Sequence, residues 1–252
     1  MAIQKTNAIV LKTLPFRSSS LIVTFFTETF GKVKGIAKGV RQEREIRGTA
    51  YDLFTNVEII YYEKTRSELH LISDCVMTEA YPSLRTTLES ITFASYFCDL
   101  VDQLTEVHDP NSTIYELLNF CFIYLSSIPA SRLSRLFEIK FLSEIGWLPH
   151  LESCLGCGKR ELESGCFSAR QGALYCVNCA RSIQDARPIS REPLHIMRYY
   201  ATHDLPDSIK LPMSKQTEKD LEELMDRFLT DRLSYPLKTR QFLSKIKPAL
   251  NC

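Results

Sequence analysis

Four cysteines are spaced as two pairs that could bind a metal ion. Cys154 and Cys157 form one C-x2-C pair, Cys176 and Cys179 form the other, and eighteen residues separate the pairs. Each pair can present two thiolates on a tight turn, and four thiolates complete the tetrahedral sphere that Zn²⁺ prefers. The spacing therefore predicts one structural zinc site. The alternative is a set of four thiols without metal, either a vestige or paired in disulfides.

A zinc ion held by four cysteines has no coordination position left for water. Hydrolytic zinc sites keep one position open, so this donor set favours a structural role over a catalytic one. The sequence also contains no G-x-x-x-x-G-K-[ST] motif, and no Ser/His/Asp or Cys/His set has local support. We therefore expect a protein that is not an enzyme.

Basic residues are the second group whose chemistry points to a ligand. Residues 1–50 hold nine Lys and Arg against three Asp and Glu, a net charge of +6, whereas the whole chain carries +1. Lys32, Lys34 and Lys38 share parity on a predicted strand and so share one face of it. A basic loop follows. The predicted nucleic-acid contacts are Lys32, Lys34, Lys38, Arg41, Arg44 and Arg47.

Such a basic ridge can follow a phosphate backbone without reading base sequence, and its binding would depend strongly on salt. The alternative is that the lysines only protect a strand edge from pairing, while Glu43 and Glu45 partly neutralise the loop. A further pair, Arg132 and Arg135, lies one helical turn apart and could dock an acidic peptide. A solvated helix face is the alternative for that pair.

The elements that must position these groups follow from two hydrophobic periods. Five segments rich in β-branched and aromatic residues predict the strands of a small OB-type barrel: 6–14, 21–28, 32–40, 53–64 and 68–77. Apolar residues at three- and four-residue steps then predict helices: 84–104, 112–127, 130–145, 190–203, 215–233 and 238–246.

The predicted fold is therefore a multidomain α+β chain. A five-stranded OB-type barrel in residues 1–80 precedes an all-α bundle in residues 81–149 and 189–252. Residues 150–188 are rich in cysteine and glycine without periodicity, so we expect a four-cysteine zinc finger, held by its metal and inserted in the bundle. No apolar stretch approaches about 20 residues, which predicts a cytoplasmic protein without a membrane partner.

Several of these segments resemble the RecO family of bacterial recombination mediators. Residues 8–12, 22–32 and 37–41 resemble its OB domain. Residues 137–149, leading into the first cysteine pair, resemble its central helices and zinc finger, and residues 237–243 resemble its tail motif. Ser18, Ser19 and Ser20 depart from the family, which usually has an acidic pair there, and Gln171 stands where the finger often has a glycine.

The resemblance implies a role in recombinational DNA repair at the nucleoid. It implies binding of single- and double-stranded DNA, annealing of complementary strands and, together with RecR, loading of RecA onto strands coated by single-strand-binding protein. It also implies that the helix carrying Arg132 and Arg135 receives the acidic tail of single-strand-binding protein.

Three other functions agree with the same residues. The barrel and the finger could handle RNA in a translation complex, which competition between RNA and DNA would detect. The metal could serve a zinc-dependent nuclease or hydrolase, which requires an open coordination position. A pure scaffold would show no DNA affinity that depends on Lys34, Lys38 and Arg41.

Overall fold

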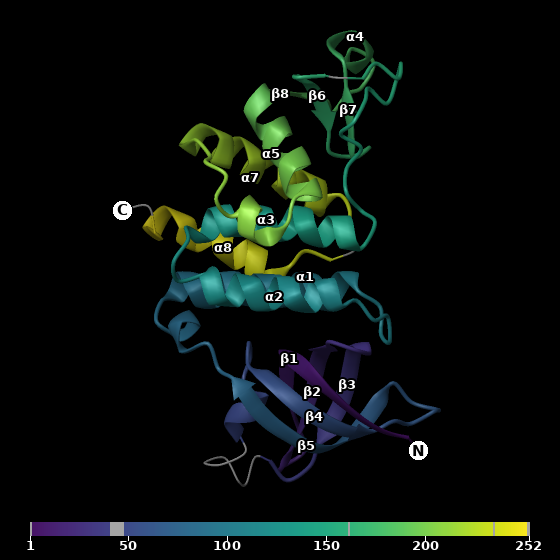
Figure 1. The fold of residues 1–252 in the computed structure, drawn as a ribbon, viewed down its shortest axis with the longest axis vertical. Coiled ribbons are helices and arrows are strands. Elements are labelled where there is room, and N and C mark those ends of the chain that lie inside the picture. The colour runs from purple at the N-terminus through teal and green to yellow at the C-terminus, as the bar shows by residue number, and fades with distance from the viewer. Residues whose placement is uncertain (1, 41–47, 161, 234, 251–252) are drawn as a thin grey trace. The chain divides into compact units, whose positions relative to one another are not determined.

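The computed structural model describes residues 2–40, 48–160, 162–233 and 235–250 (Figure 1). The chain forms two compact units. The first combines Met1–Ser127 with Leu237–Cys252, and the second is Ile128–Pro236. No helix among the described residues has the length and apolar character needed to cross a membrane.

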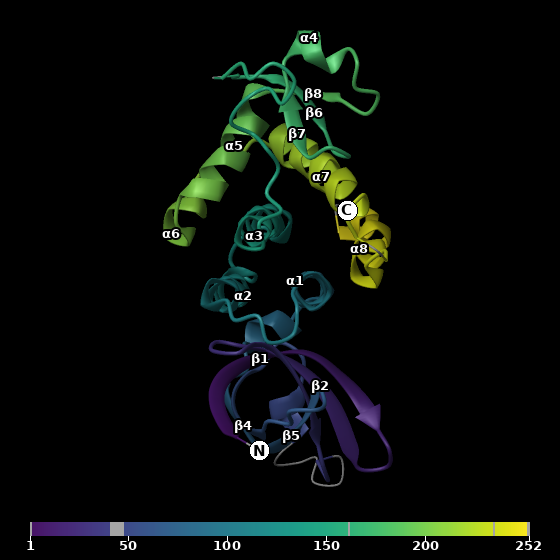
Figure 2. The same ribbon diagram turned by 90° about the vertical axis from the view of Figure 1, so that its right-hand side faces the viewer.

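The first unit begins with a closed five-stranded barrel, which confirms the predicted one. Its strands are β1 (Ile3–Phe16), β2 (Ser20–Thr27), β3 (Gly31–Ala37), β4 (Asn56–Tyr62) and β5 (Leu69–Glu79). They follow each other around the barrel in the order β1-β2-β3-β5-β4, and Figure 2 views the barrel close to end-on. Among the pairings of these described strands, β3–β5 is parallel and the others are antiparallel. Alternate residues of each strand fill the interior, among them Val23, Val33 and Ile59.

Gly35 is required by this packing. A Cβ atom at Gly35 would lie 2.3 Å from the side chain of Ile72, which occupies the same part of the interior from β5. The parallel pairing of Gly35 with His70 brings β3 and β5 together at this point. A side chain at residue 35 would therefore open the barrel where β3 meets β5.

Three α-helices among the described residues complete the first unit. Helix α1 (Leu88–Leu104) follows the short turns η1 (Gly48–Tyr51) and η2 (Pro82–Arg85), and α2 (Ser112–Tyr124) runs beside it. Thr87 caps the N-terminus of α1 and Asn111 caps that of α2. Each side chain accepts a hydrogen bond from a backbone N–H of the first turn, which defines where the helix begins. The third helix, α8 (Lys238–Leu250), comes from the other end of the sequence and packs against α1. Thr239 donates a 2.7 Å hydrogen bond to Asp99 there.

Aromatic residues in left-handed backbone conformations join the barrel to α2. Phe54 and Tyr81 have φ angles of 66° and 45°, and their rings lie 5.9 Å and 5.5 Å from that of Phe122. The hydroxyl of Tyr81 also donates to Asn119 at 2.6 Å. Such conformations persist only where the surroundings fix them, so this junction is held by packing on both sides.

The second unit contains the remaining helices and a small sheet. Helices α3 (Ala130–Glu144), α5 (Arg191–Thr202) and α7 (Lys215–Thr230) pack on one another, and α6 (Leu205–Ser208) follows α5. The sheet has the order β7-β6-β8, formed by Ala173–Tyr175, Gly165–Ser168 and Arg187–Ile189, and α4 (Val177–Ala180) extends from it. Sequence periodicity predicted the three long helices but none of these short elements.

The compact units do not coincide with the predicted domain boundaries. Helices α1, α2 and α8 belong with the barrel, whereas α3, α5 and α7 belong with the cysteine-rich segment. The predicted division was residues 1–80, a split helical domain and residues 150–188, and it stays a prediction. In the structure, the helices are divided between the two compact units.

The loop after α1 is held to the barrel by a histidine pair. The Nε2 atoms of His70 on β5 and His108 lie 3.2 Å apart. His70 accepts at Nδ1 the backbone N–H of Lys64, at 3.1 Å, so its neutral ring carries the proton at Nε2 and donates it to His108. Protonating either ring would place two N–H groups face to face. His108 itself has a φ angle of 59°, and its backbone N–H donates to Lys32.

We expect this pair to make the first unit sensitive to acid. Burial lowers the pKa of His70 below 6.5, and His108 and Lys64 lower it further, whereas Glu63 opposes them. The unfolded chain then binds the proton more tightly than the folded protein, so stability is complete above pH 6.5 and falls as the pH drops toward the folded pKa. Substituting His70→Gln should flatten this part of a plot of unfolding free energy against pH.

Chemical denaturation at pH values on both sides of 6.5 measures the effect. The matched control is His195→Gln, which replaces an exposed histidine of the second unit and should leave the slope as it is. An unchanged slope in His70→Gln would show that the pair does not control acid sensitivity.

Candidate metal centre and nucleic-acid interface

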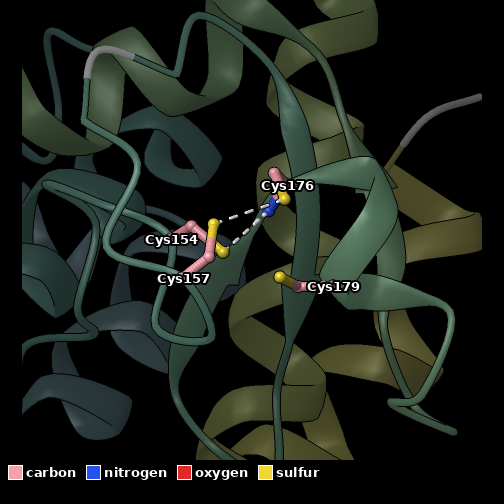
Figure 3. Close-up of side chains that lie close together, drawn as sticks. All are labelled: Cys154, Cys157, Cys176 and Cys179. Atoms are coloured by element: carbon pink, nitrogen blue, oxygen red, sulfur yellow. Dashed lines mark hydrogen bonds between the residues drawn. The ribbon is translucent and has the colours of Figure 1, made fainter.

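The four predicted ligands lie together in the second unit. The Sγ atoms of Cys154, Cys157, Cys176 and Cys179 are all within 4.8 Å of one another. Figure 3 shows the two pairs facing each other, the first on a loop and the second at the start of α4. The cluster can therefore hold one metal ion. Sulfur atoms around a tetrahedral zinc are about 3.8 Å apart, from a Zn–S bond of about 2.3 Å, and the Sγ atoms of Cys157 and Cys176 are 3.9 Å apart.

Backbone geometry explains why the first pair can turn so tightly. Gly158 has a φ of 74° and donates its N–H to the carbonyl of Cys154 at 2.8 Å. Gly156 faces the second pair, and a Cβ atom there would lie 3.0 Å from the Sγ of Cys179. Leu155 donates its N–H to the carbonyl of Leu174 on β7, so the loop is fixed to the small sheet.

The electrostatics of the cluster suit a cation. Burial raises the pKa of Cys154, but backbone N–H groups outweigh it and bring that pKa down to about 6. One of these is the N–H of Cys176, which donates to the Cys154 Sγ at 3.3 Å. The neighbouring thiols of Cys176 and Cys157 raise the pKa of Cys179 to about 12. Clustered thiolates repel one another, so a bound divalent cation would relieve that repulsion.

The first residue of the predicted basic ridge, Lys32, is not on the accessible surface. Lys32 is buried, with 5% of its surface exposed. Its Nζ donates to the carbonyls of Thr105, at 2.6 Å, and of Asp102, and lies 3.7 Å from the Asp102 carboxylate. Burial lowers the pKa of Lys32, and Asp102 partly opposes this. The prediction that Lys32 contacts nucleic acid is therefore wrong: its amine binds the C-terminal end of α1.

The other two lysines of β3 remain accessible. Lys34 is half-buried and Lys38, just past the strand, is exposed. Neither amine is in an ion pair within the part of the chain that the structure describes. Arg41, Arg44 and Arg47 fall outside the described residues, so their predicted role in binding stays a prediction.

Sequence reasoning missed a third lysine on the same face. Lys12 of β1 is opposite Thr24 of β2, and Thr24 is opposite Lys34 of β3. Lys12 is about half exposed and lies 3.7 Å from Asp102. Lys12 could have been found only from the register of β1 with β2, which cannot be read from the sequence. A β-bulge after Val10 also shifts that register.

The two arginines predicted to dock an acidic peptide bind acceptors within the second unit. Arg135 is buried, and its guanidinium donates to Glu138 at 2.8 Å. Arg132 donates to the carbonyls of Leu211 and of Ile209, the latter at 2.9 Å. An acidic peptide would first have to displace these acceptors, so a docking role here is not supported.

Two family profiles together match most of this chain. Recombination protein O N terminal matches residues 1–81 and Recombination protein O C terminal matches residues 85–241. The chain belongs to the RecO family. The RecO resemblance seen in the residues is thus confirmed, and with it a place among proteins of DNA repair and recombination.

Individual RecO proteins agree with this assignment over almost their whole length. A protein described as DNA repair protein RecO from Syntrophus aciditrophicus (strain SB) is 31% identical over 98% of this chain and 97% of its own. RecO proteins of Thermoanaerobacter sp. (strain X514) and Anaeromyxobacter sp. (strain K) are 24% and 28% identical, each over 98% of this chain and 99% and 98% of their own.

The corrected role of Lys32 gives a prediction about stability. Substituting Lys32→Met keeps the aliphatic stem but leaves the carbonyls of Asp102 and Thr105 without their donor. We expect the free energy of unfolding to fall by roughly 1–3 kcal/mol, the usual effect of unsatisfied buried groups. Denaturant titration measures it. If Lys32→Met instead left stability unchanged and weakened DNA binding, Lys32 would be a surface contact after all.

Proposed function

We propose that the protein binds DNA through the outer face of its barrel, anneals complementary strands and, with RecR, helps to load RecA onto single strands coated by single-strand-binding protein. The observation that carries this proposal is the accessible end of the β3 face, where Lys34 is in register with Lys12 through Thr24 and Lys38 is exposed just past the strand. Membership of the RecO family supports the setting in recombinational repair.

The barrel face suits contact with the nucleic-acid backbone. Ammonium groups neutralise phosphates, release condensed counterions and carry no sequence information. Binding of this kind accepts both strands of a pair equally, which annealing requires, and it weakens steeply as salt rises. Bases that are not gripped individually remain able to pair with a complementary strand.

We propose that the metal in the cysteine cluster is a structural zinc ion and that the protein is not an enzyme. Four thiolates suit zinc, and together they fill a tetrahedral sphere. When bound, the metal would neutralise the thiolates and join the two cysteine pairs. The four residues hold it, and no coordination position then accepts water or substrate.

RecR and the acidic tail of single-strand-binding protein are the protein partners that we propose, on the basis of the family role alone. Arg132 and Arg135 are not proposed as the site for that tail. Their guanidinium groups already donate to Leu211 and Glu138.

The lysines should control DNA affinity and its dependence on salt. For Lys34→Ala with Lys38→Ala, we expect weaker binding of single-stranded and duplex DNA. The slope of log affinity against log salt should also become smaller, by about 0.7–0.9 for each phosphate that the variant no longer neutralises. Fluorescence anisotropy with labelled oligonucleotides measures both.

The control for this experiment is Lys5→Ala, because exposed Lys5 pairs with Glu58 on the adjoining strand β4 and lies outside the proposed face. Annealing of complementary strands precoated with single-strand-binding protein should fall with affinity. An unaltered salt slope in the double variant would contradict DNA binding by this face.

Metal content should depend on the four predicted ligands. In Cys157→Ser we expect zinc to fall from about one ion per chain to a small fraction, because a serine hydroxyl is a poor zinc ligand. Mass spectrometry of metals in purified protein measures it. The matched control is Cys166→Ser, which changes a cysteine of β6 outside the cluster and should retain the metal. Another metal in the unaltered protein would reject zinc.

A further inference from the structure

The cysteine cluster contains one residue that solvent reaches easily. Cys157 is exposed, whereas Cys154 is buried and Cys176 and Cys179 are half-buried. A structural metal ion does not require an exposed ligand, and metal ligands that only hold a fold are usually protected. The exposure of Cys157 is therefore a feature that the proposed structural role does not explain.

The backbone on both sides of Cys157 leaves its side chain unshielded. Its neighbours are Gly156 and Gly158, which have no side chains, and both are exposed. At Gly158, no described atom lies within 4 Å of the position that a Cβ would take. A small molecule dissolved in water can therefore approach the sulfur of Cys157 without displacing a neighbouring side chain.

The cysteines outside the cluster are better protected. Cys98 and Cys121 are buried in helices of the first unit. Burial raises the pKa of Cys75 to about 12, so its thiol keeps its proton and reacts slowly. Cys166 on β6 is half-buried. Among the cysteines that the structure describes, Cys157 is thus the one that a dissolved oxidant meets first.

A second thiol lies close enough to react with an oxidised Cys157. The Sγ atoms of Cys157 and Cys176 are 3.9 Å apart, so they must approach by about 2 Å to reach the length of a disulfide bond. The Sγ of Cys154 instead accepts the backbone N–H of Cys176 at 3.3 Å, which holds it in place. Figure 3 marks these contacts between the first pair and Cys176.

We propose that Cys157 is a site of reversible oxidation by peroxides, and that Cys176 then closes a disulfide across the two cysteine pairs, which takes the place of the metal. The proposal rests on the proposed function for the presence of that metal. It goes beyond that function because it gives the cluster a second, metal-free state.

The reaction has two steps. The thiolate of Cys157 attacks one oxygen of hydrogen peroxide, so an S–O bond forms, the O–O bond breaks and hydroxide leaves; the product is a sulfenic acid. The thiolate of Cys176 then attacks that sulfur, so the S–S bond forms, the S–O bond breaks and a second hydroxide leaves. The two thiolates together lose two electrons, and the peroxide gains both.

The choice of partner determines what oxidation does to the finger. After a disulfide between Cys157 and Cys176, only the thiols of Cys154 and Cys179 remain, which is fewer than the four ligands of a structural zinc site. The metal is lost, but the two pairs stay joined by a covalent bond. Disulfides within each C-x2-C pair would also release the metal, and they would leave the pairs unconnected.

Peptide mapping of the full chain separates these outcomes. Trypsin cleaves after Lys and Arg, which places the first cysteine pair in residues 141–159 and the second in residues 171–181. The zinc-loaded protein is treated with hydrogen peroxide, its free thiols are alkylated, and it is digested without reductant. We expect mass spectrometry to find these two peptides linked, with one disulfide for each zinc ion that a chromogenic chelator detects. Dithiothreitol should reverse the link.

Two variants and one stability measurement support the mapping. Cys166→Ser should give the same linked peptide as the unaltered chain, and Cys157→Ser should give none. If Cys157→Ser does not fold, the map of the unaltered chain decides. The oxidised protein should also melt at a higher temperature than reduced protein from which a chelator has removed the metal, because the disulfide still joins the two pairs.

Three results would overturn the proposal: a disulfide confined to residues 141–159, earlier oxidation of Cys75 or Cys166, or a sulfinic acid at Cys157 without a link. The metal and the oxidation site can also be judged separately. A linked peptide from purified protein that never contained zinc would support the oxidation site and contradict the proposed metal. Bound zinc without a link after oxidation would contradict the oxidation site alone.

Discussion

The buried amine of Lys32 is the interaction on which the arrangement of the first unit depends. A strand residue of the barrel binds the last carbonyls of α1, where the helix dipole is negative, and an acidic side chain of the same helix, Asp102, lies close by. The loop that follows then lies against β3, with Gly31 so close to Asp109 that a Cβ atom would be 2.0 Å from its carbonyl oxygen. Fixing α1 here covers one end of the barrel face and so defines which end is accessible.

The division of the outer face explains how one strand can hold two kinds of lysine. Lys32 and Lys34 have the same parity and nearly the same sequence context, yet one is a structural cation and the other faces solvent in part. The difference comes from what lies over each residue. A basic residue is a candidate for binding phosphate only where its amine does not already donate to helix carbonyls.

Much of this could be predicted from the sequence, because local patterns determine local structure. Alternation located all five strands, the three-to-four residue period located six helices, and C-x2-C spacing identified the four gathered cysteines. Interactions that depend on distant residues could not be predicted. Lys32 binds a partner seventy positions away, and Lys12 and Lys34 come onto one face only through the strand register. A strand as short as β7 has too few residues for an alternation of apolar and polar side chains to be detected in the sequence.

The split composition of the first unit has a consequence for biosynthesis. Its barrel, α1 and α2 emerge from the ribosome before the second unit, but α8, which packs on α1, is translated only after the whole of that unit. The surface of α1 that α8 covers in the folded protein, including Asp99, must therefore stay uncovered while the second unit is translated. A substitution in α8 that prevents this packing would consequently act on the unit that contains the barrel, although α8 follows the second unit in the sequence.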